Sequence, residues 1–408
     1  MKLTTLREAL QRLEEVKLHL QVETLNSWEA FGRILAEDVL ADIELPPFDK
    51  SARDGYAVKS KDTFLASESN PVKLKLKGHV KIGEIPSLQI DDGECAYIPT
   101  GAPLPSGSDA VVAIEDAHRE GPLVYVFKAV APNANVTRRG SDISKGTLVL
   151  RRGTQIGVKE VALLAALGRS KVKVYKKPRA SIISTGPELV ELGRPLREGK
   201  IYDVNGYMVY SYLSKLGLEP LIVGIADDDV KDLKEKMASS LDRSDIVIVS
   251  GGTSKGEGDV LQLSLIEILK ERRGKILFHG LALKPGKPTL TAVVDEKLVV
   301  GLPGNPTSAF TVLEVMIKPW LLKNVFGSEF KERHVNAVLT RRVLSFEGRR
   351  EIVYVKLLSH GAKLLAQPIL KGSEAVTTFA GADGYIEIPE DIKFVEENSL
   401  VEVKLIDL

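Results

Sequence analysis

Apolar residues recur at helical spacing near the start of the chain and again after a long interval. Residues 5–18 place leucines on one helical face, and Thr5 with Glu8 has the spacing of a capping box. The pattern also predicts a short second helix over 28–39 and another helix at 157–168. We expect these helices to form one layer that the chain leaves and later rejoins.

Between these helical stretches, residues 44–144 carry short β-rich apolar runs broken by Pro and Gly, which predict a small β domain inserted into that layer. From residue 178 the pattern changes to regular alternation of strand and helix. Strands are expected at 181–184, 220–226, 246–249, 276–283, 289–294 and 298–301, and helices at 205–216, 230–241, 260–273 and 307–322. Such alternation is typical of a doubly wound, mostly parallel sheet.

The predicted architecture is therefore a multidomain α/β plus β chain. β texture with turn signals returns after residue 329, which indicates a C-terminal β-barrel-like domain. The expected division is a linking domain in two parts with an inserted β-rich domain, then the α/β domain and the C-terminal domain, at 1–45, 46–144, 145–177, 178–325 and 326–408.

Composition narrows the class of protein. The 408 residues include 56 basic and 55 acidic side chains, so the net charge of +1 gives no general attraction to nucleic acid or to anionic membranes. No apolar span reaches the ~20 residues of a membrane crossing, and the N-terminus lacks the apolar core of a signal peptide. A single cysteine, Cys95, excludes internal disulfides and fits a cytoplasmic protein. The six histidines show no zinc-ligand spacing.

Candidate chemistry gathers where predicted strands of the α/β domain end. Five polar clusters each follow a predicted strand directly, at 185–188, 227–229, 251–259, 284–287 and 303–306. Ligands of open parallel sheets bind outside the carboxyl ends of the strands, so we expect the five clusters to meet at one rim. Each cluster alone is explained as well by helix caps, turns and surface lysines; their joint placement favours a shared ligand site.

Residue types indicate what that site binds. Glu188, Asp228 and Asp259 suit Mg²⁺, which prefers oxygen ligands, and Lys284 with Lys287 on a loop stiffened by Pro and Gly suits oxyanions. A cation beside an oxyanion clamp points to phosphoryl or pyrophosphate chemistry.

The glycine-rich stretch 251–259 only approaches three common motifs. It has the glycine spacing of a phosphate-binding loop without the following Lys-Ser/Thr, and it lacks the third glycine of a dinucleotide fingerprint. Residues 252–256 fit the nucleophile-elbow pattern around Ser254, and a serine hydrolase with a downstream histidine base, His279, His334 or His360, stays an alternative.

Long stretches resemble the molybdopterin molybdenumtransferases of the MoeA type, which are related to the gephyrin E domain. The resemblance covers nearly the whole chain in order, in PPFDKSARDGYA, IPTGAPLPSGSDAVVAIED, RRGSDI, STGPEL, SGGTSKGEGD, LKPGKP and GLPGNPTSA. It implies insertion of the metal from molybdate or tungstate into adenylylated molybdopterin with release of AMP. It also implies an elongated four-domain homodimer with its active site at the subunit boundary.

The resemblance assigns roles by motif. It implies that Asp259, Asp228 and Glu188 hold Mg²⁺ and help to open the phosphoanhydride, while lysines at 284 and 287 act at the reacting oxyanions. The catalytic set expected on this basis is Asp54, Glu188, Asp228, Asp259, Lys284 and Lys287. The expected substrate contacts are Thr100, Arg139, Gly251, Gly252, Ser254, Pro303, Pro306, Ser308, Arg349 and Ser373. The resemblance implies that Asp54, Thr100 and Arg139 reach the site from the inserted β domain of the partner subunit.

The sequence departs from the family pattern at three positions. Thr-Gly-Pro-Glu replaces the usual Thr-Gly-Asp-Glu, so any role of the missing acid falls to Glu188, and Arg53 and Lys255 add positive charge. Arg350 beside Arg349 leaves the register of the arginine contact open. Two other functions also stay open: an ATP-dependent molybdopterin adenylyltransferase, and a non-catalytic scaffold like gephyrin.

Overall fold

The computed structural model describes residues 3–252, 259–328, 332–361 and 363–406, which form two compact units. One unit contains residues 1–37, 152–158 and 171–408; the other contains residues 38–151 and 159–170. In the first unit β1 (Val22–Asn26) pairs antiparallel with β12 (Lys171–Tyr175). The chain thus leaves this pair of strands and later returns to it. The predicted layer of helices is wrong, because the helix Leu6–Leu13 belongs to the first unit and most of the helix Val158–Ala166 belongs to the second.

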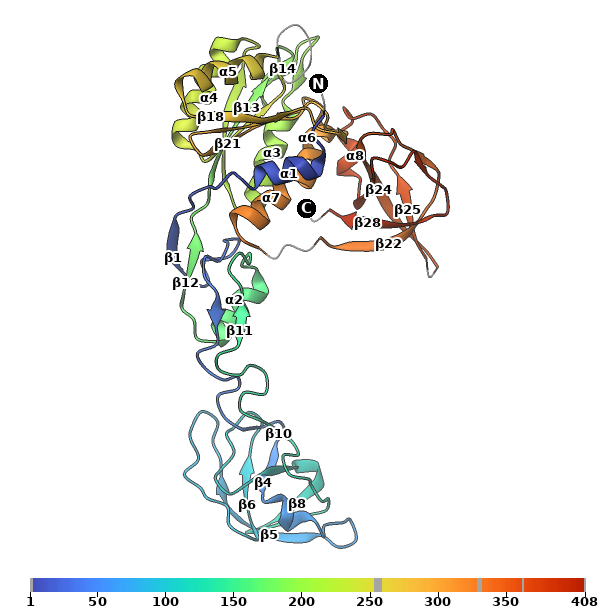
Figure 1. Cartoon of the computed structure of the whole chain (residues 1–408). Coiled ribbons are helices and arrows are strands. Elements are labelled where there is room, and N and C mark those ends of the chain that lie inside the picture. Colours follow the sequence, from blue (N-terminus) through green and yellow to red (C-terminus); the bar gives the residue numbers. More distant parts are fainter. Residues whose placement is uncertain (1–2, 253–258, 329–331, 362, 407–408) are drawn as a thin grey trace. The chain divides into compact units, whose positions relative to one another are not determined.

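The second unit is built on a six-stranded sheet in the order β7-β4-β6-β5-β9-β8, of which β4, β5, β6 and β8 are labelled in Figure 1. Apolar clusters pack on both of its faces, and the four residues of β4, which pairs with β6 and β7, are all buried. Gly55 opens β4 because a Cβ there would lie 1.9 Å from the carbonyl oxygen of Val112. The strands are β4 (Gly55–Val58), β5 (Val72–His79), β6 (Glu94–Ile98), β7 (Ala110–Ala113), β8 (Ala117–Glu120) and β9 (Leu123–Val126).

Four smaller strands and a helix complete the second unit. β3 (Lys50–Ser51) pairs with β10 (Val136–Thr137), and β2 (Val39–Leu40) pairs with β11 (Leu148–Leu150). α2 (Val158–Ala166) confirms the helix predicted at 157–168.

The α/β domain of the first unit has a six-stranded sheet in the order β16-β13-β17-β21-β20-β18. The first four strands are parallel, and β20 runs antiparallel to both of its neighbours, so the sheet is mostly parallel as predicted. The strands are β13 (Arg179–Thr185), β16 (Glu219–Ala226), β17 (Ile246–Ser250), β18 (Gly274–His279), β20 (Leu290–Val294) and β21 (Lys297–Leu302).

Helices cover both faces of this sheet because strand residues alternate between the two faces. Ile182, Ile248 and Val300 share one apolar cluster with α3 (Val204–Lys215) and α6 (Pro306–Val312). Residues of opposite parity on the same strands pack with α4 (Val230–Arg243) and α5 (Val260–Glu271) (Figure 1). The doubly wound fold is therefore confirmed.

The first helix joins this core. α1 (Leu6–Leu13) carries the predicted capping box between Thr5 and Glu8, and its apolar face is buried in the cluster of α3 and α6. Trp320 donates from Nε1 to the carbonyl oxygen of Leu13 at 2.8 Å. The helix predicted at 307–322 begins as α6 and continues through π-helical turns at Leu313–Ile317 and Leu321–Val325, with α7 (Lys318–Trp320) between them.

The helix predicted over 28–39 is wrong. This segment contains turns, and Gly32 has a positive φ of 75°. Its backbone pairs instead with other segments, since Gly32 donates to Ile156 and Leu35 donates to Thr154. Tertiary backbone pairing has overridden the local apolar pattern. Trp28, the first residue of the predicted helix, is 62% exposed.

The C-terminal domain is a closed β-barrel, as predicted. Its strands follow the order β24-β25-β22-β28-β26, and a further pairing of β26 with β24 closes the ring. The strands are β22 (His334–Leu339), β24 (Arg350–His360), β25 (Lys363–Pro368), β26 (Gly384–Ile388) and β28 (Leu400–Leu405). Outside the ring, β19 (Leu283–Lys284) pairs with β24, β23 (Val343–Leu344) pairs with β27 (Phe394–Val395), and α8 (Thr377–Ala380) follows β25.

The single strand predicted at 276–283 is in fact two strands. β18 ends at His279 in the α/β sheet, whereas β19 belongs to the barrel through its pairing with β24. The fourth polar cluster therefore does not follow a strand of the α/β sheet. The chain crosses from one domain to the other directly before Lys284.

Candidate functional site

A cavity of about 1350 Å³ lies between the α/β domain and the barrel. The carboxyl ends of β13, β17 and β21 form one wall, and barrel residues around 349–354 and 369–378 form the other. Each of the five polar clusters contributes at least one residue to the lining. The cluster at 284–287 reaches the cavity from β19, so the expected convergence holds although one of its strands lies in the other sheet.

Most of the residues expected at the site line this cavity. They are Glu188, Asp228, Gly251, Gly252, Lys284, Lys287, Pro303, Pro306, Ser308, Arg349 and Ser373. Ser254 lies outside the described residues. Asp259 is described but is not part of the lining, and Asp54, Thr100 and Arg139 belong to the other unit.

Positive charge in the cavity comes from Lys284, Lys287 and Arg349, all half-buried, and from the exposed Lys371. Lys284 Nζ lies 2.8 Å from Glu351 Oε1 and 4.0 Å from the centre of the Phe346 ring, so its ammonium is held on two sides. Glu351 is a lining residue that sequence reasoning missed. Its Oε2 is buried and has no hydrogen-bond partner.

The two neighbouring arginines differ in their surroundings. Arg349 lines the cavity, whereas Arg350 makes ion pairs at 3.3 Å with Glu387 and Glu390. Arg350 is thus bound within the barrel, and Arg349 is the arginine placed beside the cavity lysines.

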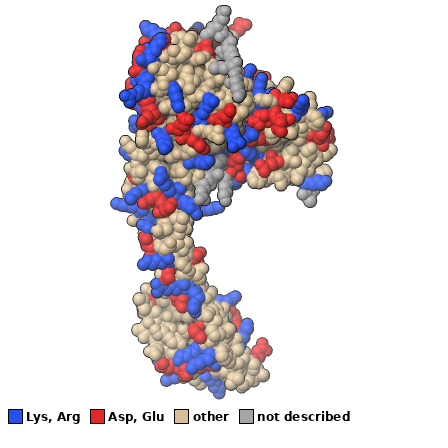
Figure 2. All heavy atoms as spheres, in the orientation of Figure 1, with Lys and Arg blue, Asp and Glu red and all other residues tan. Residues whose placement is uncertain are grey.

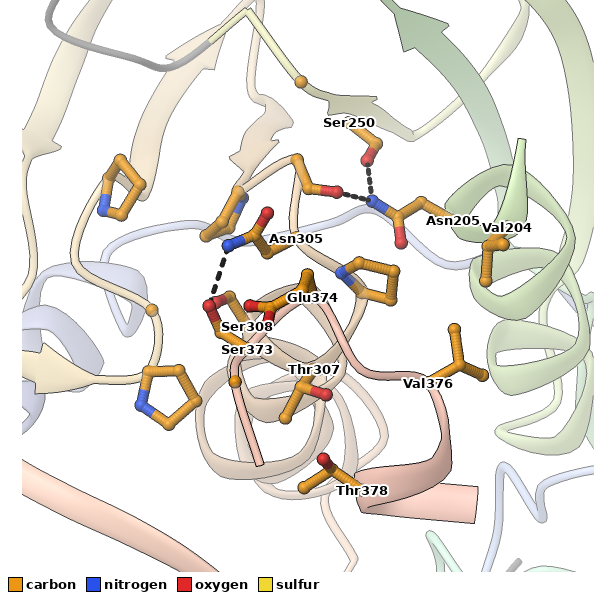
Figure 3. A pocket seen from close by; sticks show the side chains of 18 of the residues that line it. Val204, Asn205, Ser250, Asn305, Thr307, Ser308, Ser373, Glu374, Val376 and Thr378 are labelled. Carbon is orange, nitrogen blue, oxygen red and sulfur yellow. Dashed lines mark hydrogen bonds between the residues drawn. The ribbon is translucent and has the colours of Figure 1, made fainter. Parts of the chain in front are cut away.

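Hydrogen bonds fix the start of α6 against the barrel, as Figure 3 shows. Asn305 donates from Nδ2 to Ser373 Oγ at 2.7 Å, and the Thr307 amide donates to the Ser373 carbonyl oxygen at 3.1 Å. Thr307 also donates its hydroxyl to the carbonyl oxygen of Ala375 at 3.0 Å. These contacts between the two domains therefore join the wall that carries Ser308 to the wall that carries Ser373.

The glycines that follow β17 allow a close backbone approach. Gly251 has a φ of 93°, and a Cβ on it would lie 2.2 Å from the carbonyl oxygen of Thr185. Gly252 has a φ of 66° and a looser surrounding, since its Cβ would lie 3.0 Å from the Thr185 Cγ2. Glycine at 251 lets the ends of β13 and β17 meet at the cavity floor.

The three acidic residues expected to bind a metal are placed differently from one another. Glu188 and Asp228 are exposed at the cavity. Asp259 caps α5 by accepting from the Gln262 amide at 2.9 Å, and burial raises the pKa of its carboxyl group. Its Oδ2 lies 3.1 Å from His279 Nε2 but has no hydrogen-bond partner.

Within the described part of the chain, no group of three or more His, Cys, Asp or Glu residues is placed to hold a metal ion. Mg²⁺ is commonly bound through one or two carboxylates together with phosphate oxygens and water. Glu188 and Asp228 at the cavity provide such a donor set, and Asp259, whose Oδ2 lies 3.1 Å from His279 Nε2, is a further carboxylate outside the cavity lining. These residues fit Mg²⁺ without forming a complete cage.

In the inserted domain, Asp54 and Thr100 form a local pair. Asp54 Oδ1 accepts from the Thr100 amide at 2.7 Å and from the Thr100 hydroxyl at 3.0 Å. These two hydrogen bonds lower the pKa of the exposed Asp54 carboxyl group. Arg139 pairs with Glu44, and its amide donates to Asp49 at 2.7 Å.

The sequence reasoning also missed Asn205, which is 7% exposed and lines the cavity (Figure 3). Its side chain joins the ends of two strands by donating to Ser250 Oγ at 2.8 Å and to the Gly304 carbonyl oxygen at 2.7 Å. The only sequence signal was its position two residues after Asp203, the N-cap of α3.

Fold and cavity together define the class: a multidomain protein whose doubly wound α/β domain borders a cavity at the carboxyl ends of its strands. Comparison with known families identifies the family. The chain matches the MoeA N-terminal region (domain I and II) over residues 4–168 and the MoeA C-terminal region (domain IV) over residues 336–406. Between them, residues 181–323 match the family described as a probable molybdopterin binding domain.

Individual relatives agree over nearly the full length. The chain is 33% identical to the molybdopterin molybdenumtransferase of Staphylococcus aureus over 94% of this chain and 91% of that one. It is 41% identical to a molybdopterin biosynthesis MoeA protein from Pyrococcus horikosii, whose crystal structure matches with a TM-score of 0.82 over 99% of both chains. The chain belongs to the MoeA family of molybdopterin molybdenumtransferases.

Proposed function

We propose that this enzyme inserts the metal from molybdate or tungstate into adenylylated molybdopterin with Mg²⁺-dependent release of AMP. The observation that carries the proposal is the cavity, which combines Lys284, Lys287 and Arg349 with the carboxylates Glu188 and Asp228. A tetrahedral dianion needs fixed donors and positive charge, and a phosphoanhydride needs its own charge neutralised as it opens.

Specific side chains would perform these tasks. Lys284, held by Glu351 and Phe346, and Lys287 would bind the oxyanion and stabilise the phosphate oxygens of the substrate. Glu188, Asp228 and Asp259 would hold Mg²⁺. When bound, Mg²⁺ would neutralise the negative charge that develops on the phosphoanhydride.

The substrate-binding surface would draw on both walls of the cavity: Ser308, the backbone of Gly251 and Gly252 and the loop from Pro303 to Pro306 on one side, and Arg349 with Ser373 on the other. Ser308 and Ser373 can each donate one hydroxyl hydrogen to an oxyanion. Because the hydrogen bonds of Asn305 and Thr307 hold the two walls together, the donors are positioned before the oxyanion arrives.

We further propose a homodimer in which Asp54, Thr100 and Arg139 of one subunit contribute to the cavity of the other. The Asp54–Thr100 pair is held by two hydrogen bonds and is exposed, as a residue acting on a partner's substrate must be.

Basic and acidic side chains alternate over the face shown in Figure 2, which supports a small-molecule rather than a nucleic-acid partner. None of the helices in the described part of the chain is long and apolar enough to cross a membrane. The single, buried Cys95 suits a cytoplasmic location.

The test is AMP release from adenylylated molybdopterin with Mg²⁺ and either molybdate or tungstate. We expect release that depends on the oxyanion, and we expect Lys287→Ala to abolish it. Lys356→Ala removes an exposed lysine of β24 and serves as the matched control, with activity expected to stay unchanged. Absence of release with both oxyanions, from wild-type protein that binds the substrate, would refute the proposal. ATP-dependent formation of the adenylylated pterin would instead show an adenylyltransferase.

A further inference from the structure

Lys371 lines the cavity on its barrel wall, two residues before Ser373, and is exposed there. Its ammonium donates from Nζ to the Thr377 hydroxyl oxygen at 2.8 Å. That acceptor is neutral, and within the part of the chain that the structure describes no carboxylate pairs with this lysine. Lys284 differs, because Glu351 balances its charge at 2.8 Å. Lys371 therefore brings an unbalanced positive charge to the cavity.

The hydroxyl that holds this ammonium is itself fixed in place. Thr377 opens α8, and Phe379 of the same helix stacks on Phe310 of α6 with ring centres 4.7 Å apart. Just before α8, the carbonyl oxygen of Ala375 accepts from the Thr307 hydroxyl of α6 at 3.0 Å. Packing and hydrogen bonding thus anchor the partner of the lysine before any ligand arrives. A cation that is positioned in advance loses less freedom on binding an anion than a mobile one.

The ammonium of Lys371 keeps donors for a ligand. It carries more N–H groups than the single one that the Thr377 hydroxyl accepts. The neighbouring acid, Glu374, turns its carboxylate toward Gly372, since a Cβ on Gly372 would lie 1.9 Å from Glu374 Oε1. Because Lys371 is exposed, its remaining N–H groups are open to solvent and to a ligand.

The neighbours of Lys371 indicate which class of ligand it suits. Arg349 and Ser373 line the same wall of the cavity and add a guanidinium and a hydroxyl group. Tetrahedral oxyanions suit such a wall, because they can accept from several N–H and O–H donors at once and gain most from donors that are charged.

We propose that Lys371 binds a tetrahedral oxyanion of the ligand and so extends the set of anion-binding residues along the barrel wall. The inference rests on the proposed function, whose reactants carry such groups as phosphates and as molybdate or tungstate. Both sources present the same chemistry to the lysine, and separate binding measurements distinguish them.

The experiment measures binding of molybdate alone and of AMP alone to wild-type protein and to Lys371→Met, by calorimetry at fixed ionic strength and without Mg²⁺. Methionine keeps most of the length of the side chain and removes its charge. We expect the dissociation constant of at least one anion to rise by about fivefold to tenfold, because a charged donor is lost. The anion that is weakened identifies the source. Adenosine, which lacks the phosphate of AMP, should bind equally to both proteins.

Three further variants separate charge from structure. Lys371→Arg keeps the charge and should retain most of the affinity. Thr377→Val keeps the lysine but removes the hydroxyl that holds it, so binding should weaken less than in Lys371→Met. Lys356→Met, on an exposed position of β24 outside the cavity lining, controls for general loss of positive charge and should leave both affinities unchanged.

Wild-type affinity for both anions in Lys371→Met would overturn the inference, and so would failure of the wild-type protein to bind either anion. An equal loss in Lys356→Met, or an equal loss of adenosine binding, would overturn it as well. None of these measurements depends on turnover. A protein that binds an anion through Lys371 but releases no AMP refutes the proposed function alone, and an active enzyme whose anion affinities Lys371→Met leaves unchanged refutes this inference alone.

Discussion

Replacing Lys284 with methionine tests whether this lysine serves the substrate, the fold or both. Its ammonium lies 2.8 Å from the carboxylate of Glu351, whose side chain is 11% exposed, while the lysine side chain is 36% exposed. The change would leave Glu351 nearly buried and unpaired. Two consequences are expected, a loss of stability and a loss of oxyanion binding, and they can be measured separately.

The stability loss can be bounded from the pair's surroundings. Removing one partner of a fully buried ion pair costs about 3–5 kcal/mol, and an exposed pair contributes about 0–1 kcal/mol. Since solvent reaches the lysine, screening reduces the cost of removing it. We therefore expect Lys284→Met to lower the free energy of unfolding by about 2 kcal/mol. At roughly 2–4 °C per kcal/mol for a domain of 150–250 residues, the Tm should fall by about 4–8 °C.

The decisive comparison is the double variant Lys284→Met with Glu351→Gln, which removes the unpaired charge. Thermal unfolding should show most of the lost Tm restored, whereas oxyanion-dependent AMP release should stay absent. Lys356→Met, on an exposed position of β24, controls for loss of a lysine. Full activity in Lys284→Met would refute the assignment to the oxyanion, and a double variant as unstable as the single one would refute the ion-pair reasoning.

Three further outcomes are expected. Gly251→Ala should lower the Tm and activity more than Gly252→Ala, because a Cβ at 251 would meet a backbone carbonyl oxygen at 2.2 Å and one at 252 only a side-chain methyl at 3.0 Å; equal losses would contradict this. Thr100→Val removes the weaker of the two causes that lower the Asp54 pKa, so carboxyl NMR titration should show that pKa raised yet still below its ordinary value. Since the folded pKa is depressed, the pair's contribution to stability is present above the unfolded pKa of about 3.9 and is lost as pH falls through the folded value. Finally, Asp54→Ala and Lys287→Ala subunits, each inactive alone, should regain activity when refolded together, and no recovery would speak against a shared site.

Much of the fold is determined by local patterns. The strands and helices of the α/β domain lie within a few residues of their predicted positions, because alternation of apolar and polar residues is itself what packs against a sheet or a helix. The capping box at Thr5 and Glu8 formed as its spacing predicted, since it depends only on residues three apart. The polar clusters at strand ends also come together at one cavity, as their placement predicted.

Contacts between distant segments decided the rest. The segment at 28–39 is not helical because its backbone pairs with residues 154–156, and the strand predicted at 276–283 divides because β19 pairs with β24 of the barrel. The intrinsic preference of a short segment for helix or strand is small compared with the stabilisation that such pairings provide through hydrogen bonds and burial.

By itself the sequence determined the family and a part of the residues that line the cavity, because both are written in motifs of adjacent residues. Only the tertiary structure showed Lys284 held by Glu351, Arg349 rather than Arg350 at the cavity, and Lys371 held by a neutral hydroxyl group. Each of these depends on which groups already have partners. Partners far apart in the chain meet only after folding, so the hydrogen-bonding capacity left for a ligand is a property of the folded molecule.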